Sequence, residues 1–282
     1  MARLMRWVIG AVVVLAFAPR AFAQDFVLRG AEPAYHWGGL YVGGQIGYTS
    51  SVVNFSTAVG PEISDILRDT SIETDEQISQ WSLLGSRNPT STSYGAFVGY
   101  NYEWESVILG MEANYNHFAL TAVSSGALQR SFTDSGNLPA GHNYFYTMNV
   151  SGESAFSMTD AATFRARFGW QAGHFLPYFF AGLAVGRIDT ATATTLSYTA
   201  VDYPDSETPP LTPLNDLAVG PETDGASQSG QFTYGFATGL GIDFAITANL
   251  FVRGEFEYIY FAPIDGIQVS LSSARVGAGF KF

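Results

Sequence analysis

The sequence contains no cysteine and only one lysine, Lys281. The missing thiols exclude a disulfide framework and cysteine-ligated metal sites, and they are compatible with an exported protein. Basic residues are few, with 13 Lys and Arg against 25 Asp and Glu. Nucleic-acid binding depends on positive charge facing the phosphates, so we expect no nucleic acid among the partners.

Long hydrophobic runs are also missing. A membrane-spanning helix needs about 20 apolar residues, and the longest such run, 7–18, is shorter. It follows two arginines and precedes an Ala-Phe-Ala sequence that ends at Ala23. A basic start, a short apolar run and small residues at the cleavage point describe a secretory signal peptide. We therefore predict a signal peptide over 1–23, with cleavage between Ala23 and Gln24.

Aromatic residues and glycine are abundant: aromatics form 15% of the chain, which has 30 glycines. They occur in segments where apolar and small or polar residues alternate in steps of two, the pattern of a half-buried β-strand. After a polar lead-in at 24–37, such segments lie at about 38–50, 92–104, 107–119, 154–171, 176–188, 230–244, 250–261 and 270–282. Most have at least about 10 residues, enough for a tilted membrane crossing.

The connections between these segments alternate in length. Tight turns separate them at one end, and longer polar stretches, predicted as extracellular loops, lie at about 51–91, 120–153, 189–228 and 262–269. Ile63, Ile66 and Leu67 have helical spacing, which predicts one or two helical turns. Five prolines place 189–228 outside a sheet interior. This wiring is typical of an all-β, eight-stranded antiparallel transmembrane β-barrel over 38–282, preceded by a periplasmic lead-in.

The apolar rows of the strands are expected to face lipid. Aromatic residues mark both ends of these rows, as in the interfacial girdles of membrane proteins. One girdle comprises Tyr48, Tyr94, Tyr115, Tyr234, Tyr258 and Tyr260. The other comprises Trp104, Trp170, Phe244, Phe280 and Phe282. The opposite rows, rich in Gly and Ala, then face the narrow lumen of a small barrel.

The lumen-facing rows carry charges that balance. We predict a lumen charge network formed by Glu103, Glu112, Asp243, Glu255 and Glu257 with Arg165, Arg167, Arg253, Arg275 and Lys281. Buried charges persist when they are paired and hydrogen-bonded. An ion-selective constriction more often carries one sign in excess. The balance therefore favours a salt-bridged plug.

The acidic surplus lies elsewhere in the chain. Residues 24–282 hold 10 basic and 25 acidic residues, a net charge of −15, and most of it falls in the four predicted loops. Such a rim can be a solvated surface that keeps neighbours apart. It can also be bridged by divalent cations to lipopolysaccharide, or meet a basic host ligand. No loop has the spacing of a dedicated calcium site, and we expect neither a metal site nor a cofactor.

A catalytic alternative rests on two histidines. His117 ends a predicted strand near the long-loop rim, His142 lies in the adjoining loop, and Asp160 and several serines are nearby. A Ser-His-Asp triad is defined by geometry, which the sequence leaves open. We expect no enzyme activity.

Three motifs carry a resemblance to a known family. They are W-G-G-L-Y-V-G-G-Q-I-G-Y at 37–48, R-G-E-F-E-Y-I-Y at 253–260 and R-V-G-A-G-F-K-F at 275–282. Together they resemble the small OmpA-like barrel family of Gram-negative outer-membrane proteins, especially the RopB-like, opacity-type porin group. The resemblance implies an outer-membrane location, no shared catalytic residues, and recognition of Phe280 and Phe282 by the barrel-assembly machinery.

The expected function is therefore that of a monomeric integral outer-membrane protein with a structural and surface-interaction role. Its partners would be outer-membrane lipid, lipopolysaccharide and an extracellular or host ligand. A small diffusion channel is the alternative, and a lipid-modifying enzyme at the rim is a third.

Overall fold

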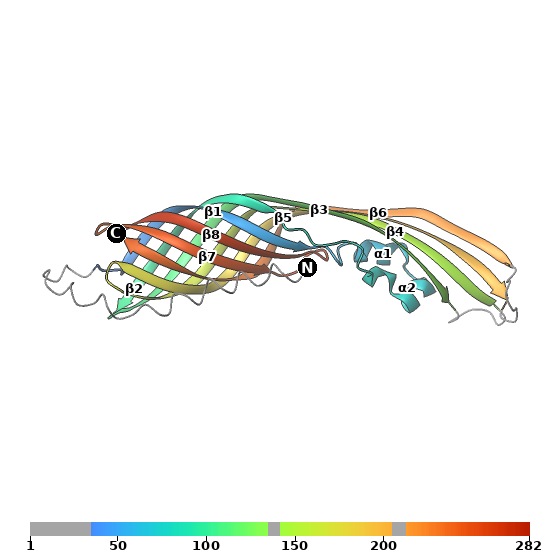
Figure 1. Ribbon diagram of the computed structural model, residues 1–282, viewed down its shortest axis with the longest axis horizontal. Helices are drawn as coiled ribbons and strands as arrows, with labels where there is room; N and C mark the ends of the chain where they lie inside the picture. The colour runs from blue at the N-terminus through green and yellow to red at the C-terminus, as the bar shows by residue number, and fades with distance from the viewer. Residues whose placement is uncertain (1–34, 135–141, 205–212) are drawn as a thin grey trace, which may run out of the picture. The chain divides into compact units, whose positions relative to one another are not determined.

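The computed structural model describes residues 35–134, 142–204 and 213–282. The predicted signal peptide, its cleavage point between Ala23 and Gln24, and most of the lead-in lie outside these residues. Eight strands form a closed barrel in which each strand pairs antiparallel with the next and β8 pairs with β1 (Figure 1). They are β1 (Gly39–Asn54), β2 (Thr90–Trp104), β3 (Val107–Asp134), β4 (His142–Trp170), β5 (Phe175–Pro204), β6 (Asn215–Ala245), β7 (Leu250–Phe261) and β8 (Gln268–Lys281). The predicted fold class is confirmed.

The two faces of the barrel wall have the predicted polarity. Along β1, Leu40, Val42 and Ile46 are exposed on the outside while Tyr41 and Gln45 are buried inside. Closure pairs the backbone groups of every strand, as a wall in contact with lipid requires. The apolar outer face therefore matches a hydrocarbon environment.

Exposed aromatic side chains lie at both ends of this apolar face. Trp104 and Trp170 lie at the rim where short turns join β2 to β3 and β4 to β5, the short-turn rim. Tyr94, Tyr115 and Tyr234 lie toward the opposite end. Their positions agree with the two predicted girdles.

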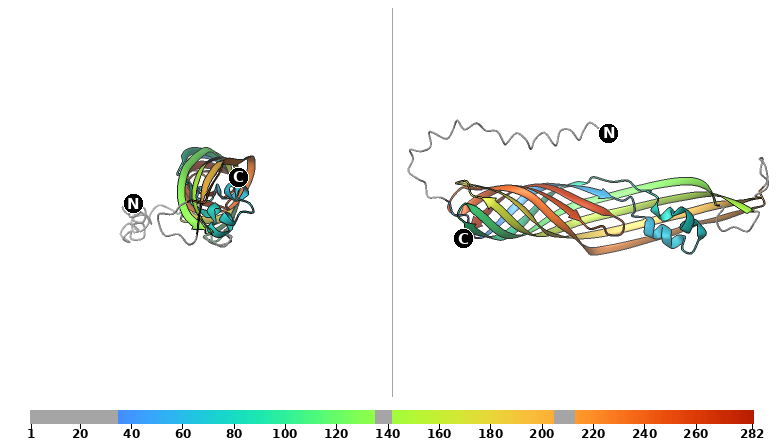
Figure 2. Two further views of the ribbon diagram at one scale, coloured as in Figure 1. Left: turned by 90° about the vertical axis from the view of Figure 1, so that its right-hand side faces the viewer. Right: turned by 90° about the horizontal axis from the view of Figure 1, so that it is seen from below.

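The predicted loops at 120–153 and 189–228 are wrong. Strands β3 to β6 run on beyond the barrel as a four-stranded sheet (Figure 2), here called the extension, which comprises 118–134, 142–160, 187–204 and 215–233. Its register is regular over long stretches, for example Gln129↔Asn149 and Asn149↔Ser197. Ser, Thr and Ala occupy both faces of these segments, so they lack the apolar–polar contrast by which the barrel strands are recognised.

Two of the five prolines in 189–228, Pro204 and Pro221, lie in strands without interrupting the sheet, and Pro209 and Pro210 lie outside the described residues. Pro204 ends β5, and Pro221 lies within β6 next to a bulge between Leu196 and Tyr198 of β5. Strand β7 pairs with β6 only from Gly235 onward, so β6 is an edge strand around Pro221. An edge strand tolerates the missing N–H because no neighbour accepts it.

The predicted loop 51–91 becomes a folded cap. Residues 55–89, here the cap segment, contain α1 (Gly60–Ile66), α2 (Ser71–Glu76) and the 3-10 helix η3 (Ile78–Gln80), and α1 confirms the predicted helical turns. None of the helices in the described part of the chain is long and apolar enough to cross a membrane. The cap helices lie beside the extension (Figure 2). Apolar side chains of the cap segment and the inner face of the extension form one buried cluster. This cluster includes Ile63, Leu67, Ile72, Ile78, Leu120, Met148, Phe156 and Leu196.

Candidate functional site

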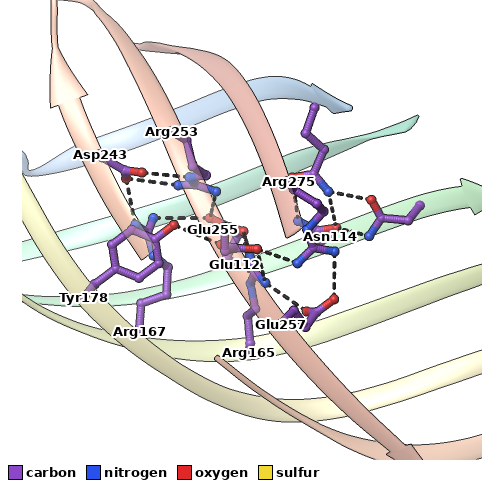
Figure 3. A network of polar contacts seen from close by, with 12 residues as sticks. Glu112, Asn114, Arg165, Arg167, Tyr178, Asp243, Arg253, Glu255, Glu257 and Arg275 are labelled. Carbon is purple, nitrogen blue, oxygen red and sulfur yellow. Dashed lines mark hydrogen bonds and ion pairs between the residues drawn. The ribbon is translucent and has the colours of Figure 1, made fainter. Parts of the chain in front are cut away.

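Charged side chains gather in the middle of the barrel lumen (Figure 3). Eight of the ten predicted residues form one cluster, here the lumen cluster: Glu112, Arg165, Arg167, Asp243, Arg253, Glu255, Glu257 and Arg275. It has four acidic and four basic members, so its formal charges cancel. The register creates it, because Glu112↔Arg165, Asp243↔Arg253 and Glu255↔Arg275 are cross-strand neighbours on inward-facing rows.

Arg165 is the centre of the lumen cluster and is completely buried. Its guanidinium donates to Glu112 Oε1 from Nε at 3.1 Å, to Glu255 Oε2 from Nη2 at 2.7 Å, and to Glu257 Oε1 from Nη1 at 3.0 Å. Strand β5 offers Gly182 opposite Arg165, where a Cβ atom would lie 2.5 Å from Arg165 Cα. Glycine at this position leaves the arginine the space it occupies.

The remaining arginines complete the network. Arg253 donates to Asp243 Oδ1 at 2.8 Å and to Glu112 Oε2 at 2.8 Å. Arg167 donates to Asp243 Oδ2 at 2.7 Å. Arg275 pairs with Glu255 and, through Nη1, with Glu257 Oε2 at 2.7 Å. Every carboxylate of the cluster thus contacts at least two arginines, and charge-assisted bonds of this kind are among the stronger hydrogen bonds.

Aromatic residues complete the cluster, although they were not among the residues predicted from the sequence. Tyr41 donates to Glu112 Oε2 at 2.7 Å, and Tyr178 donates to Glu255 Oε2 at 2.9 Å. The guanidinium carbon of Arg167 lies 3.8 Å from the ring centroid of Tyr178, and that of Arg165 lies 4.0 Å from Phe180. Such cation–π contacts stabilise a desolvated cation. Tyr41, Tyr178 and Phe180 occupy inward-facing positions in the alternating pattern of their strands, and this position was the signal that could have identified them.

Other layers fill the lumen on both sides of the cluster. Toward the short-turn rim, the ring centroids of Trp37 and Tyr41 lie 6.2 Å and 5.8 Å from that of Phe251. Toward the extension, Gln45 donates to the side-chain oxygens of Asn114 at 2.9 Å and Asn116 at 2.6 Å. The apolar cluster beneath the cap segment follows. These layers leave the buried charges surrounded by packed side chains.

Two predicted members of the network lie apart from it. Glu103 accepts a hydrogen bond from the backbone amide of Gly38 at 3.0 Å, and its other oxygen lies 3.6 Å from His36 Nδ1. Lys281 donates to the backbone carbonyl of His36. Both occupy the ends of their strands at the short-turn rim. The prediction that their side chains occupy inward-facing positions was correct, but they lie at a different level along the barrel axis from Arg165.

The histidines of the catalytic alternative do contact carboxylates. His117 Nδ1 lies 2.9 Å from Asp160 Oδ1, and His142 Nδ1 lies 2.9 Å from Asp202 Oδ2. Within the described ranges no serine hydroxyl hydrogen-bonds to either imidazole, and no three His, Asp or Glu residues are placed to hold a metal ion. The His117 pair lies on the outer wall, among the residues of an aromatic girdle.

The predicted assembly signal lies at the short-turn rim. Phe280 and Phe282 are exposed, and their ring centroids lie 5.3 Å apart. The amide of Phe282 donates to the carbonyl of Leu40 at 2.9 Å, which fixes the last residue beside β1. Neither ring contributes to the buried core.

Comparisons with known proteins agree with this architecture. A family model described as an outer membrane protein beta-barrel domain matches residues 9–282. The 25 kDa outer-membrane immunogenic protein of Brucella ovis is 22% identical over 283 residues, covering 98% of this chain and 96% of that protein. The protein of the same name from Brucella abortus is 22% identical over 291 residues, covering 98% and 97%.

Two solved structures are also similar to this chain. The attachment invasion locus protein Ail of Yersinia pestis, in complex with the heparin analogue sucrose octasulfate, has a TM-score of 0.32 and 15% identity, with 86% of this chain and 99% of that chain covered. Neisserial surface protein A has a TM-score of 0.37 and 13% identity, with 86% and 97% covered.

Proposed function

Because the chain belongs to the outer membrane protein beta-barrel family, we propose that its barrel is a closed, monomeric anchor in the outer membrane that holds the extension outside the cell as a contact surface. The lumen cluster is the observation that carries the proposal. Arg165 and Glu112 lie midway along the lumen with almost no exposed surface, and packed layers lie on both sides of them.

The chemistry of the cluster supports a closed lumen. A pore that conducts ions keeps its charged groups hydrated and usually carries an excess of one sign. Here each carboxylate is hydrogen-bonded to arginines and the formal charges cancel. Removing one partner of a buried ion pair leaves an uncompensated charge at a cost of about 3–5 kcal/mol. Opening a path through the network would require several such losses together.

The surface role rests on the extension and the cap segment. These parts are folded rather than loose, and they expose acidic side chains, among them Asp65, Asp69, Asp75, Glu153, Asp216 and Glu222. The Brucella relatives are named as immunogenic outer-membrane proteins, which supports a surface location for the corresponding part of this chain. Divalent cations that bridge to lipopolysaccharide, or a basic extracellular ligand, are the partners that fit this charge.

The absence of cysteine makes the topology directly testable. Asn149→Cys places a thiol on the extension, and Ala248→Cys places one in the turn between β6 and β7; both positions are exposed. In intact cells a membrane-impermeant maleimide should label only Asn149→Cys. Ala248→Cys should react only after permeabilisation. The reverse pattern would contradict an extension outside the cell.

A liposome-permeation assay tests closure. Liposomes that contain the purified barrel should hold a small sugar as well as protein-free liposomes do. Rapid release of the sugar would favour the diffusion-channel alternative. Arg68→Gln, at an exposed position of the cap segment, serves as a control that should behave like the unmodified protein.

A further inference from the structure

A groove crosses the outer wall of the barrel on strands β2 to β5. Its volume is about 660 Å³ and its lining is almost entirely apolar. Two successive outward-facing rows form it, Val42–Val98–Ala113–Phe164–Leu183 and Ala96–Tyr115–Ala162–Val185. The three alanines leave room between the larger side chains. A depression of this composition suits a hydrocarbon chain.

The next outward-facing row, where the barrel meets the extension, contains polar and charged side chains. Register places Tyr94 beside His117, His117 beside Asp160, Asp160 beside Arg187, and Arg187 beside Phe232. Successive rows on one face of a strand are separated by two residues, about 7 Å. Charged groups therefore begin directly above the groove, at the level of the aromatic girdle, where a membrane changes from hydrocarbon to headgroups.

Arg187 is the available cation in this row. The carboxylate of its neighbour Asp160 already accepts hydrogen bonds from Tyr115 Oη and, at 2.6 Å, from Thr159 Oγ1. It also lies 2.9 Å from His117 Nδ1. Asp189, two residues away, accepts from the amide of Gly230 at 2.6 Å. The side chain of Arg187 is exposed, and its guanidinium forms no ion pair or hydrogen bond with another residue in the described part of the chain.

We infer that this wall binds a lipid with a phosphate headgroup, whose acyl chain lies in the groove and whose phosphate contacts Arg187. The inference rests on the proposed function to the extent that the barrel must lie in a membrane with the extension outside. Guanidinium groups bind phosphate oxygens through two parallel N–H donors. Successive rows are about 7 Å apart, so a lipid whose acyl chain lies in the groove has its headgroup phosphate within reach of Arg187.

Two other apolar grooves of the outer wall lack this arrangement. One is lined by Ile46, Ile242, Phe244, Val252 and Val276, and another by Ile46, Tyr94, Ala274 and Val276. The charged residues that contribute to their floors, Arg253 and Arg275, are buried and belong to the lumen cluster. Of these three apolar grooves, the one on β2 to β5 is bordered in the next outward-facing row by an exposed basic side chain, Arg187.

Native mass spectrometry of the full-length purified barrel tests this inference. The probes are lipid A with its phosphates, the same lipid after phosphatase treatment, and phosphatidylglycerol. The variants are Arg187→Gln, which removes the cation, and Ala162→Phe, which fills the groove. Arg130→Gln is the matched control, because Arg130 lies over the ring of Trp81, with its guanidinium carbon 4.6 Å from the ring centroid, on the extension.

We expect Arg187→Gln to weaken retention of the phosphorylated lipid by about tenfold or more, the loss expected when one charge-assisted contact is removed. Ala162→Phe should also weaken retention, because the added ring occupies the space of the acyl chain. Arg130→Gln should bind like the unmodified protein. Retention of lipid A but not of phosphatidylglycerol would identify the lipopolysaccharide leaflet as the source of the ligand. Retention of both lipids would show that a phosphate headgroup together with an acyl chain is sufficient for binding. Equal retention by Arg187→Gln, or of the dephosphorylated lipid, would overturn the inference. Sugar permeation measured on the same preparations separates a failure of this site from a failure of the closed barrel.

Discussion

Arg165 and Glu112 face each other across the ladder between β3 and β4, with Arg165 Nε 3.1 Å from Glu112 Oε1. Arg165 also contacts the two glutamates of β7, on the other side of the lumen. A single guanidinium therefore joins strands that are not neighbours in the barrel wall. This contact turns a row of inward charges into a crosslink through the lumen.

Replacing Arg165 by methionine should destabilise the barrel by about 3–5 kcal/mol, because three buried carboxylates would lose a shared counter-ion. Urea unfolding followed by the gel mobility of the folded barrel measures the change. Arg68→Met removes an exposed pair with Asp65 on the cap segment and should leave the transition midpoint almost unchanged, since surface ion pairs contribute little. Equal effects of the two substitutions would contradict a structural role for the cluster.

The cap segment should detach without unfolding the barrel when Ile63 becomes alanine. Ile63 is buried in α1 within the apolar cluster, and truncating a packed isoleucine costs about 2–5 kcal/mol. Limited proteolysis should cut residues 55–89 faster in this variant while the barrel band persists on the gel. Ser64→Ala, at the exposed neighbouring position, is the control. Unchanged proteolysis of Ile63→Ala would mean that the cap does not depend on this packing.

Glu62 should make docking of the cap segment sensitive to pH. Burial raises the pKa of its carboxyl above the usual 4.5, and the carboxylates of Asp224, Asp265 and Asp65 raise it further. An acid whose pKa is higher in the docked state binds its proton more tightly there, so docking is strongest at low pH and weakens as the pH rises through the raised pKa.

Proteolysis of residues 55–89 should therefore quicken between acidic and neutral pH, after correction for the protease's own profile. Glu62→Gln keeps the shape of the side chain and removes the charge, so its proteolysis should stay slow at both pH values. Asp75→Asn, at an exposed position of α2, should retain the pH response of the unmodified protein. A pH response in Glu62→Gln equal to that of the unmodified protein would rule out this carboxyl as its cause.

Deleting Phe282 should reduce the amount of protein in the outer membrane far more than it changes the stability of barrels that do fold. Phe282 is 68% exposed and its ring meets that of Phe280 edge-on at the rim, so little core packing is lost. The proposed cause is poorer recognition by the barrel-assembly machinery. Phe175→Ala removes an exposed aromatic ring from the same rim and should assemble normally. Normal outer-membrane levels of the protein lacking Phe282 would refute the proposal.

The barrel could be predicted from the sequence because its strands have strong alternation, with large apolar residues such as Leu40 and Val42 opposite small or polar ones. The strands of the extension could not be predicted in this way. Thr190, Thr192 and Thr194 point inward and Ala191, Ala193 and Thr195 outward, which gives little contrast between the faces. These strands are stabilised by hydrogen bonds to their neighbouring strands and by packing against the cap segment. The periodicity of a single strand reveals neither its pairing partners nor the packing of the cap.

The lumen cluster could be predicted only in part. The alternation of side chains along each strand identified which charged residues point inward, and this was enough to place Glu112 and Arg165 in the cluster. Height along the barrel depends on the register between strands, so Glu103 and Lys281 were assigned to a network that lies deeper in the lumen. The contributions of Tyr41 and Tyr178 depend on contacts across the lumen, which join strands far apart in the sequence.

Single-channel recording in a planar lipid bilayer tests the closed lumen most directly. The purified barrel, with folding checked by gel mobility, should give a quiet baseline, because the paired charges around Arg165 and the packed layers on both sides leave no hydrated path for ions. Steady openings of uniform size from the unmodified protein would contradict the account and favour a small pore.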